Sequence, residues 1–318
     1  MANATLAAHK TLVVMGRETT YGTAFVTPTV KLPDMFDYSF GKEQIQVPQK
    51  TQTIAPMIQT SQLGRLKPTV TLKGAFSDTH EEMWVALFGD ATGPAYTIAA
   101  DDIAINAAGY SYTIASLVPT GSSAIGVGVV ATGCRMVSFT LAPENGIIMY
   151  TAVFDAKSID DQSASHSWVL SGITDTSAPV IVPFMLKSVT ASLLDTVAVT
   201  ALTNFSLTIT NEYASDDICF QNSATRTSQP KCGTTGALTC EFLYGTENDA
   251  TIYDNLVGQT PYTDNIILTD GTNIHTIATE GQYIDYSRPD KDKCLFLSNF
   301  TKELKGTSAV VPITVTTS

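Results

Sequence analysis

The stretch that decides the fold is PTVTLKGAFSDTHEEMWVALFG, residues 68–89. Its first part, Pro68–Phe76, alternates apolar and polar side chains and is rich in β-branched residues, which predicts a half-buried β-strand. Ser77 then precedes an acidic first turn and Gly89 follows an apolar stripe, so a short α-helix is predicted next. The stripe comprises Met83, Trp84, Leu87 and Phe88. The sequence thus predicts a strand that leads directly into a helix.

The same plan returns in ALTCEFLYGTENDATIYDNLVG, residues 237–258. Thr246 takes the capping position there, Gly258 takes the terminating position, and the stripe comprises Ile252, Tyr253, Leu256 and Val257. The second strand and helix therefore follow the first at a nearly constant offset.

The offset is seen in three matches. The strands align Thr69 with Ala237, and the helices, one position further apart, align Gly89 with Gly258. At the same offset as these strands, Asp37–Phe40 aligns with Phe205–Thr208. We interpret the offset as an internal duplication, and a chance strand-helix match within a two-domain β protein is the alternative.

Strand signals dominate the rest of the chain. Alternating runs rich in β-branched or aromatic residues, bounded by Gly, Pro, Asn or Asp, occur at residues 136–141, 147–154, 189–193 and 205–210. Asn145-Gly146, between two of these runs, suits a tight hairpin turn because both residues tolerate positive φ. The predicted fold is mainly β.

The length of 318 residues suggests two domains. We place the first at residues 34–160 and the second at residues 184–318, each as a β-sandwich or barrel-forming domain with one short α-helix. Ser, Asp, Gln and Pro residues indicate a linker at 161–183, and residues 1–33 are predicted to form an N-terminal arm. Residues from about 91 to 132 lie outside the repeated plan, so we expect an inserted β segment that decorates the surface.

The composition excludes two classes of protein. The chain has 18 Lys and Arg against 30 Asp and Glu, a formal net charge of −12, and only 15% of its residues are charged. Disordered chains are rich in charge and poor in large apolar residues, whereas 44% of this chain is hydrophobic. A nucleic-acid reader needs clustered Lys and Arg to neutralise phosphates. The sequence therefore predicts a folded protein that does not grip nucleic acid.

No segment has the length of a membrane span or of the apolar part of a signal peptide, so we expect a chain that is made and kept in a cytoplasm until assembly. The cysteines are Cys134, Cys219, Cys232, Cys240 and Cys294. Their odd number and wide spacing favour free thiols over a disulfide framework.

No group of residues has the spacing of a familiar active site. Gly121–Gly128 lacks the Lys and the following helix of a phosphate-binding loop, and Ser165-His166-Ser167 offers neither an oriented base nor an oxyanion hole. The four histidines are too scattered for a metal site, namely His9, His80, His166 and His275. The acidic pairs Asp101-Asp102, Asp160-Asp161 and Asp216-Asp217 suit solvated turns. We predict no enzyme activity and no catalytic, cofactor-binding or metal site.

Several segments resemble the tail tube proteins of tailed bacteriophages. Gly16–Ala24, followed by Pro28-Thr29 and Lys31–Pro33, is similar to the N-terminal region of that family. Residues resembling the family's paired strands are Gly133–Leu141 with Asn145-Gly146, Val153–Lys157, and Asn204–Glu212.

The resemblance implies a β-sandwich-like subunit whose strands join those of neighbouring copies in a continuous barrel, with the helix outside. It implies a structural virion protein of the tail, assembled in the host cytoplasm, whose rings stack into a hollow tube that conducts phage DNA. The partners would be other copies of the chain, other tail proteins and, transiently, double-stranded DNA. With two tube units per chain, a trimer with pseudo-sixfold symmetry is favoured over a hexamer.

Two surfaces carry further expectations. The polar segment Gly41–Leu63 is predicted to be a long loop and, with the N-terminal arm, is a candidate for contacts between rings. Acidic residues are expected to outnumber basic ones on the strands that face the channel. Other functions left open are a capsid decoration protein, a cell-surface β adhesin and a carbohydrate-active β-sandwich enzyme.

Overall fold

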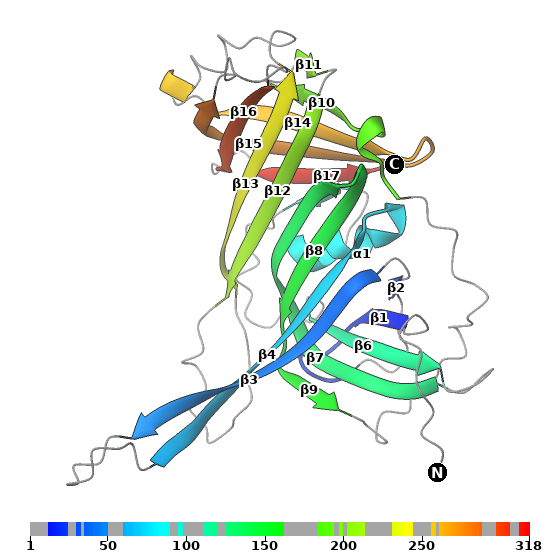
Figure 1. Ribbon diagram of the computed structural model, residues 1–318, viewed down its shortest axis with the longest axis vertical. Coiled ribbons are helices and arrows are strands. Elements are labelled where there is room, and N and C mark those ends of the chain that lie inside the picture. Colours follow the sequence, from blue (N-terminus) through cyan, green and yellow to red (C-terminus); the bar gives the residue numbers. More distant parts are fainter. Residues whose placement is uncertain are drawn as a thin grey trace.

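A computed structural model describes most of the chain. The described residues are 12–24, 30–32, 35–49, 60–89, 95–97, 111–119, 125–161, 183–193, 197–199, 202–213, 231–243, 256–258, 261–287, 297–305 and 312–318. Within them the fold is mainly β, as predicted, and the strands pair antiparallel in one large twisted sheet (Figure 1).

The strands fall into two halves of the chain. The first half contains β1 (Leu12–Arg17), β2 (Val30–Leu32), β3 (Met35–Gln49), β4 (Thr60–Ala75), β5 (Ala95–Thr97), β6 (Tyr112–Pro119), β7 (Ile125–Glu144), β8 (Ile147–Asp155) and β9 (Ser158–Asp161). The second half contains β10 (Thr190–Leu193), β11 (Val197–Val199), β12 (Leu202–Tyr213), β13 (Lys231–Leu243), β14 (Tyr262–Thr269), β15 (Ile274–Ser287), β16 (Leu297–Leu304) and β17 (Ile313–Thr317).

A short 3-10 turn, η2 (Asp78–His80), leads into helix α1 (Glu81–Phe88), and a second turn, η4 (Leu186–Ser188), precedes β10. The predicted helix is confirmed: Ser77, in an extended conformation, is the N-cap residue of the leading turn η2, and Gly89 ends α1 with a φ of 81°. The predicted hairpin is also confirmed, because Asn145 and Gly146 both have positive φ, 54° and 82°.

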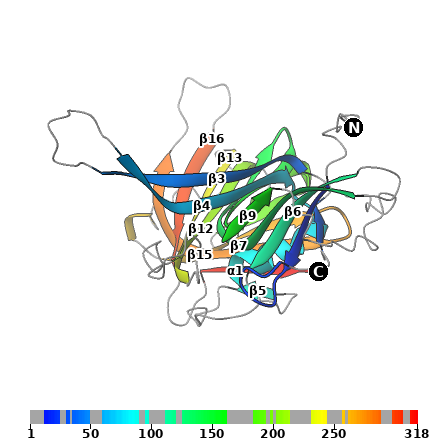
Figure 2. The same cartoon turned by 90° about the horizontal axis from the view of Figure 1, so that it is seen from below.

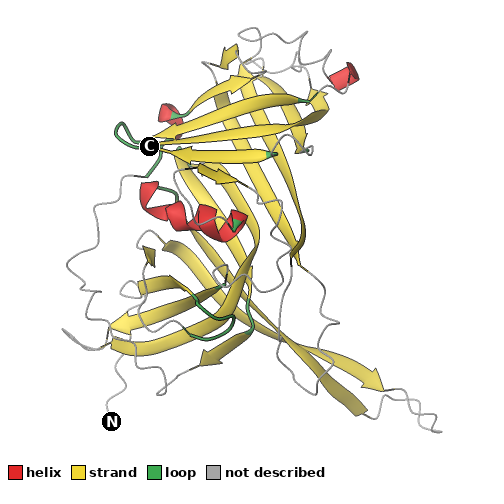
Figure 3. Ribbon diagram, turned by 180° about the vertical axis from the view of Figure 1, so that it is seen from behind, coloured by secondary structure: helices red, strands yellow, loops and turns green. Residues whose placement is uncertain are grey.

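Eight strands form a continuous sheet in the order β3-β4-β8-β7-β12-β13-β16-β15. Strands β7 and β15 continue past this sheet into a second layer. There the first part of β7 pairs with β6 and β9, and the first part of β15 pairs with β14 and β17. Helix α1 lies across the back of the sheet, beside the place where the two halves meet (Figure 3).

The core is continuous across both halves. Phe76, Trp84, Phe139 and Tyr150 are all fully buried and make edge-to-face or stacked ring contacts under α1. Phe184 joins them, with its backbone N–H donating to the Phe76 carbonyl and its carbonyl accepting from the backbone N–H of Ile148. The segment that connects the two halves is therefore anchored by Phe184 in the core of the first half.

Every strand pairing described within the first half has a counterpart in the second. Pairs β1–β2, β1–β6, β3–β4 and β4–β8 correspond to β10–β11, β10–β14, β12–β13 and β13–β16. Pairs β6–β7, β7–β8 and β7–β9 correspond to β14–β15, β15–β16 and β15–β17. Apart from β5, the strands of the two halves thus have the same order and the same pairing.

Two register shifts occur at equivalent places in both halves. The shift at Met136/Ser138 between β7 and β8 matches the one at Tyr283/Asp285 between β15 and β16. The shift at Met35/Asp37 in β3 matches the one at Leu202/Asn204 in β12. Such bulges are positional features of a fold rather than random defects.

The registers also refine the offsets read from the sequence. With the bulges aligned, the pair Leu72↔Ala152 corresponds to Cys240↔Phe300, so β4 and β13 align at the offset that the sequence indicated. Strands β3 and β12 align differently, because Tyr38, rather than Asp37, corresponds to Phe205. The alignment of these two strands from the sequence was wrong by one position, and in a strand one position exchanges the two faces.

Some expected boundaries differ from the structure. The expected arm supplies β1 and β2, and Val13 and Met15 are buried in the core. Within the expected insertion at 91–132, the described strand β6 and the first part of β7 belong to the core rather than to a surface decoration, because Ile114 and Val130 have no exposed surface. Most of the expected linker, residues 162–182, lies outside the described residues.

The second predicted helix is described only at residues 256–258, which are helical. Leu256 packs against the core, but Val257 is 67% exposed, so its place in a buried apolar stripe was wrong. Ile252 and Tyr253 lie outside the described residues.

The predicted loop at 41–63 is largely a β-ribbon. Strand β3 continues to Gln49 and β4 begins at Thr60, and the two stay paired from Gln44↔Leu66 to Gln49↔Thr60. This ribbon projects well beyond the rest of the sheet (Figures 1 and 2).

Candidate functional site

One face of the eight-stranded sheet is rich in hydroxyl groups, and we call it the polar face. Side chains alternate along each strand, so the face opposite the core is formed by the residues between the buried ones. In β12, for example, Phe205, Leu207 and Ile209 are buried whereas Ser206 and Thr208 are not. Its hydroxyl residues are Ser39, Thr69, Thr71, Ser138, Thr140, Thr151, Ser206, Thr208, Thr210, Thr235, Thr239, Ser287 and Thr301.

The polar face crosses from one half of the chain to the other without a break. Strand β7 pairs with β12 from Leu141↔Leu207 to Ser138↔Thr210, and the Thr140 and Thr208 hydroxyls lie 3.4 Å apart on the polar side. On the opposite side Phe139 packs into the buried core. We call this β7–β12 pairing the inner joint.

Asn211 of β12 anchors the inner joint in the core. Its amide donates to the carbonyl oxygens of Leu87, at 2.9 Å, and Met136, at 3.1 Å. The Leu87 carbonyl belongs to the last turn of α1, where carbonyls lack partners within a helix. Thr234 donates to the oxygen of the same amide at 2.8 Å. One buried side chain thus binds α1, β7 and β13 together.

The polar face is acidic within the part of the chain that the structure describes. Its acidic residues are Asp37, Glu43, Glu144, Asp155, Glu212, Glu241, Asp285 and Glu303. Its basic residues are Lys67, Lys73 and Arg135. The Lys73 ammonium already pairs with the Glu144 carboxylate at 2.7 Å, and Lys305, just after β16, pairs with Glu303 at 2.9 Å. The face therefore offers few cations to a polyanion.

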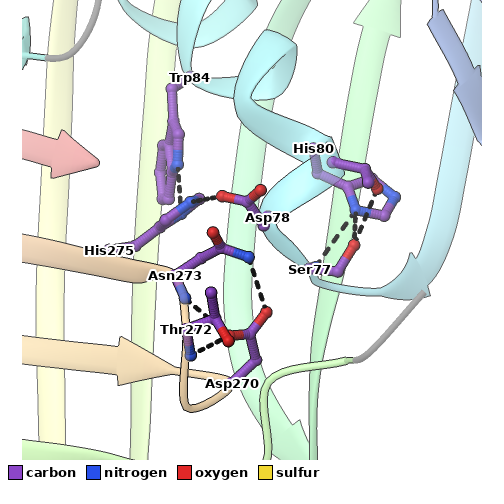
Figure 4. A network of polar contacts seen from close by, with 9 residues as sticks. Ser77, Asp78, His80, Trp84, Asp270, Thr272, Asn273 and His275 are labelled. Carbon is purple, nitrogen blue, oxygen red and sulfur yellow. Dashed lines mark hydrogen bonds and ion pairs between the residues drawn. The ribbon is translucent and has the colours of Figure 1, made fainter. Parts of the chain in front are cut away.

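A polar cluster beside α1 also joins the two halves (Figure 4). The Trp84 indole N–H donates to Nδ1 of His275 at 3.3 Å, and Nε2 of His275 lies 3.2 Å from Asp78 Oδ1. Below them, Asp270 accepts the backbone N–H groups of Thr272 and Asn273 at 2.8 Å in the β14–β15 turn. These two hydrogen bonds lower the pKa of Asp270.

Asp78, Glu81 and His275 lie close enough to hold a metal ion, with one ligand atom of each within 4.8 Å of the others. The hydrogen bonds of His275 do not favour metal binding, because both of its ring nitrogens already have partners. Because Nδ1 of His275 accepts from Trp84, its proton sits on Nε2, where it donates to Asp78. Burial lowers the pKa of His275, which is fully buried, so the ring is held neutral in a structural contact.

His80 also has a structural role. Its Nδ1 accepts the Ser77 backbone N–H at 3.2 Å and lies 2.9 Å from the Ser77 hydroxyl, in the place that Glu or Gln takes in a capping box. Burial lowers the pKa of His80 to about 4. Sequence spacing could not associate His80 and His275, because only the fold places both beside Phe76.

The other candidates from the sequence form no reaction centre among the described residues. Gly126 and Val127 of the glycine-rich segment pair with β6, and Asp160-Asp161 lie in β9. Cys134 and Cys240 are free, as predicted, and their burial raises the pKa of each thiol. Outside the described residues, or without a described side chain, are His9, Asp101-Asp102, Ser165-His166-Ser167, Asp216-Asp217, Cys219, Cys232 and Cys294.

The second half has a buried polar group that sequence reasoning missed. The Lys302 ammonium donates to Asp264 Oδ2 at 2.8 Å and to the Thr279 carbonyl at 2.7 Å, and Tyr283 donates to Asp264 Oδ1 at 2.9 Å. The side chains of Lys302 and Asp264 have no exposed surface. Desolvation lowers the pKa of Lys302, and the Asp264 carboxylate opposes that effect.

The family comparison decides between the functional classes. The model of the phage tail tube protein family matches residues 8–292, which span both halves. The chain belongs to the phage tail tube family. A comparison with curated proteins found no match.

As a phage tail tube protein, the chain is a structural component of the virion tail. The match favours this role over the adhesin, the capsid decoration protein and the carbohydrate-active enzyme. Across the described residues, no helix is long and apolar enough to cross a membrane.

Proposed function

We propose that this tail tube protein polymerises as stacked rings into a hollow tube that conducts phage DNA into the host cell. The observation that carries the proposal is the polar face, which runs across eight strands and through the inner joint. Among the described strands, this sheet has edges at β3 and β15, and closure into a barrel with neighbouring copies would satisfy them. The subunits would assemble in the host cytoplasm and meet other tail proteins at the ends of the tube.

We also propose that the chain holds two copies of one tube unit. The equivalent pairings and the two equivalent bulges support this, since chance would not reproduce both. In this proposal the first unit begins near β1 and the second near β10. Three chains would then supply six units, in a trimeric ring with pseudo-sixfold symmetry.

The polar face would line the channel. Its hydroxyl groups bind water and its acidic residues repel phosphate, so DNA would pass without being held. The acidic excess on this face agrees with the charge expected for such a wall. The core side, covered by α1, would face outward.

Electron microscopy of the purified protein tests the proposal. Hollow tubes of uniform diameter are expected, and a threefold rather than sixfold cross-section would distinguish the trimer from a hexamer. A monodisperse monomer at every concentration and salt tested would contradict tube formation. A channel wall with more basic than acidic side chains would contradict the assignment of the polar face.

A further inference from the structure

The two ends of the eight-stranded sheet are equivalent to the two strands of the inner joint. The order β3-β4-β8-β7 is repeated as β12-β13-β16-β15, so β3 corresponds to β12 and β15 to β7. Inside the chain, β7 and β12 meet. The outer edge of β15 is therefore equivalent to the edge of β7 that meets β12, and the outer edge of β3 is equivalent to the edge of β12 that meets β7.

The second part of β7 has a neighbour on each side, β8 on one and β12 on the other. The equivalent part of β15 pairs with β16 along Asp285–Ser287. Its other edge meets no strand among those that the structure describes. The outer edge of β3 along Asp37–Glu43 also meets no described strand, because β4 is the one described neighbour of β3.

We propose that β15 of one chain pairs antiparallel with β3 of the next chain, in the register of the inner joint. This outer joint rests on the proposed function, because it supplies the contact that closes the ring. Transferring the pair Ser138↔Thr210 through the aligned bulges places Asp285 opposite Glu43 of the next chain. In the same way, Thr140↔Thr208 becomes Ser287 opposite Gly41.

The outer joint differs from the inner one in charge. At the inner joint the opposed polar-face residues are uncharged, whereas the outer joint sets the Asp285 carboxylate against that of Glu43. Like charges directly opposite each other weaken a strand pair. Added salt screens exposed charges, so ring closure should be favoured by ionic strength while the inner joint is unaffected.

Cysteine cross-linking tests the register. Residues directly opposite in antiparallel strands have Cα atoms about 4.5–5.5 Å apart, within the reach of a disulfide. The single variants Glu43→Cys and Asp285→Cys are mixed and oxidised, so that any product joins two chains. Ser39→Cys is the matched control for Glu43→Cys, because Ser39 lies on the same face of β3 but about 13 Å further along the strand.

A covalent dimer is expected from Glu43→Cys with Asp285→Cys, and no dimer above the wild-type background from Ser39→Cys with Asp285→Cys. The wild-type background accounts for the native cysteines. Equal cross-linking of both mixtures, or none in either, would overturn the outer joint. Tubes seen by electron microscopy in the absence of the specific dimer would leave the proposed function standing and refute only this interface.

Discussion

The Trp84 indole N–H donates to Nδ1 of His275 at 3.3 Å, although the two residues lie far apart in the sequence. Trp84 lies on α1 of the first half, whereas His275 is near the start of β15 in the second. Both side chains are fully buried, so neither group can exchange this partner for water. This buried hydrogen bond therefore fixes the first half of the chain against the second.

Replacing His275 should weaken the contact between the halves. His275→Leu leaves the buried Trp84 N–H without its acceptor, and we expect the free energy of unfolding to fall by about 1–3 kcal/mol. A double-mutant cycle with Trp84→Phe, measured by denaturant unfolding, checks the coupling. Trp84→Phe removes the donor, so adding His275→Leu to it should cost clearly less than it costs in the wild type. Strict additivity would show that the hydrogen bond contributes nothing.

His80 should make the protein sensitive to mild acid. Its pKa is about 4 in the folded protein and about 6.5 in an unfolded chain, so the unfolded chain binds more protons between these values. The contribution of His80 to the free energy of unfolding is therefore complete above pH 6.5 and falls as the pH drops toward 4. Between pH 7 and pH 5 this group should remove about 2 kcal/mol.

The control for this pH effect is His80→Asn, whose amide oxygen can accept the Ser77 N–H but does not titrate. Denaturant unfolding at pH 7 and pH 5 should show a smaller loss in His80→Asn than in the wild type. The same loss in both proteins would mean that other groups cause the acid sensitivity.

Removing one partner of the Lys302–Asp264 ion pair should lower the stability of the protein strongly, whereas replacing both partners by apolar residues should lower it much less. Removing one partner, as in Lys302→Met, leaves a buried carboxylate without its counter-ion and should cost about 3–5 kcal/mol. The equivalent position of Lys302 in the first half is occupied by Phe154, which is fully buried. An apolar side chain is therefore compatible with the position of Lys302 in the fold.

The double variant Lys302→Met with Asp264→Leu is the decisive comparison. We expect it to recover much of the stability lost in Lys302→Met, as judged by denaturant midpoints. If the double variant is less stable than the single one, the hydrogen bond from Tyr283 to Asp264 contributes more to stability than the Lys302–Asp264 ion pair does.

The β3–β4 ribbon is the proposed contact between rings. Removing residues 45–65 and joining Gln44 to Leu66 by Asn-Gly should shorten the ribbon at an existing strand pair. A two-stranded ribbon outside the core contributes little stability, so the thermal midpoint should hardly change. Electron microscopy should then show folded subunits or single rings without extended tubes. Tubes of normal length would contradict a role in stacking.

Much of the fold was predictable from local pattern. The strand and helix at residues 68–89, the Asn145-Gly146 turn and the offset between β4 and β13 all depend on side-chain alternation, capping and positive φ, which act over a few residues. The family resemblance was also visible in the sequence, because it rests on short segments. Features that depend on a few neighbouring residues can be read from the order of the residues.

Pairing between distant strands was not predictable in the same way. The sequence pattern predicts that β6 belongs to a surface insertion, although β1 and β7 flank it in the core. The offset between β3 and β12 was wrong by one position, because alternation alone does not show where a bulge exchanges the faces of a strand. The polar sequence of the ribbon predicts a loop, because its two strands are held by pairing with each other and carry no apolar alternation.

The sequence by itself determined a mainly β chain of acidic, lightly charged composition and predicted a similar plan in its two halves. The tertiary structure decided which strand edges of the two halves meet, which residues form the polar face and where the buried polar groups find partners. Trp84 and His275, or Lys302 and Asp264, carry no mutual signal in the sequence. Contacts over such separations depend on the registers of several strands at once, and those registers are set only when the whole sheet forms.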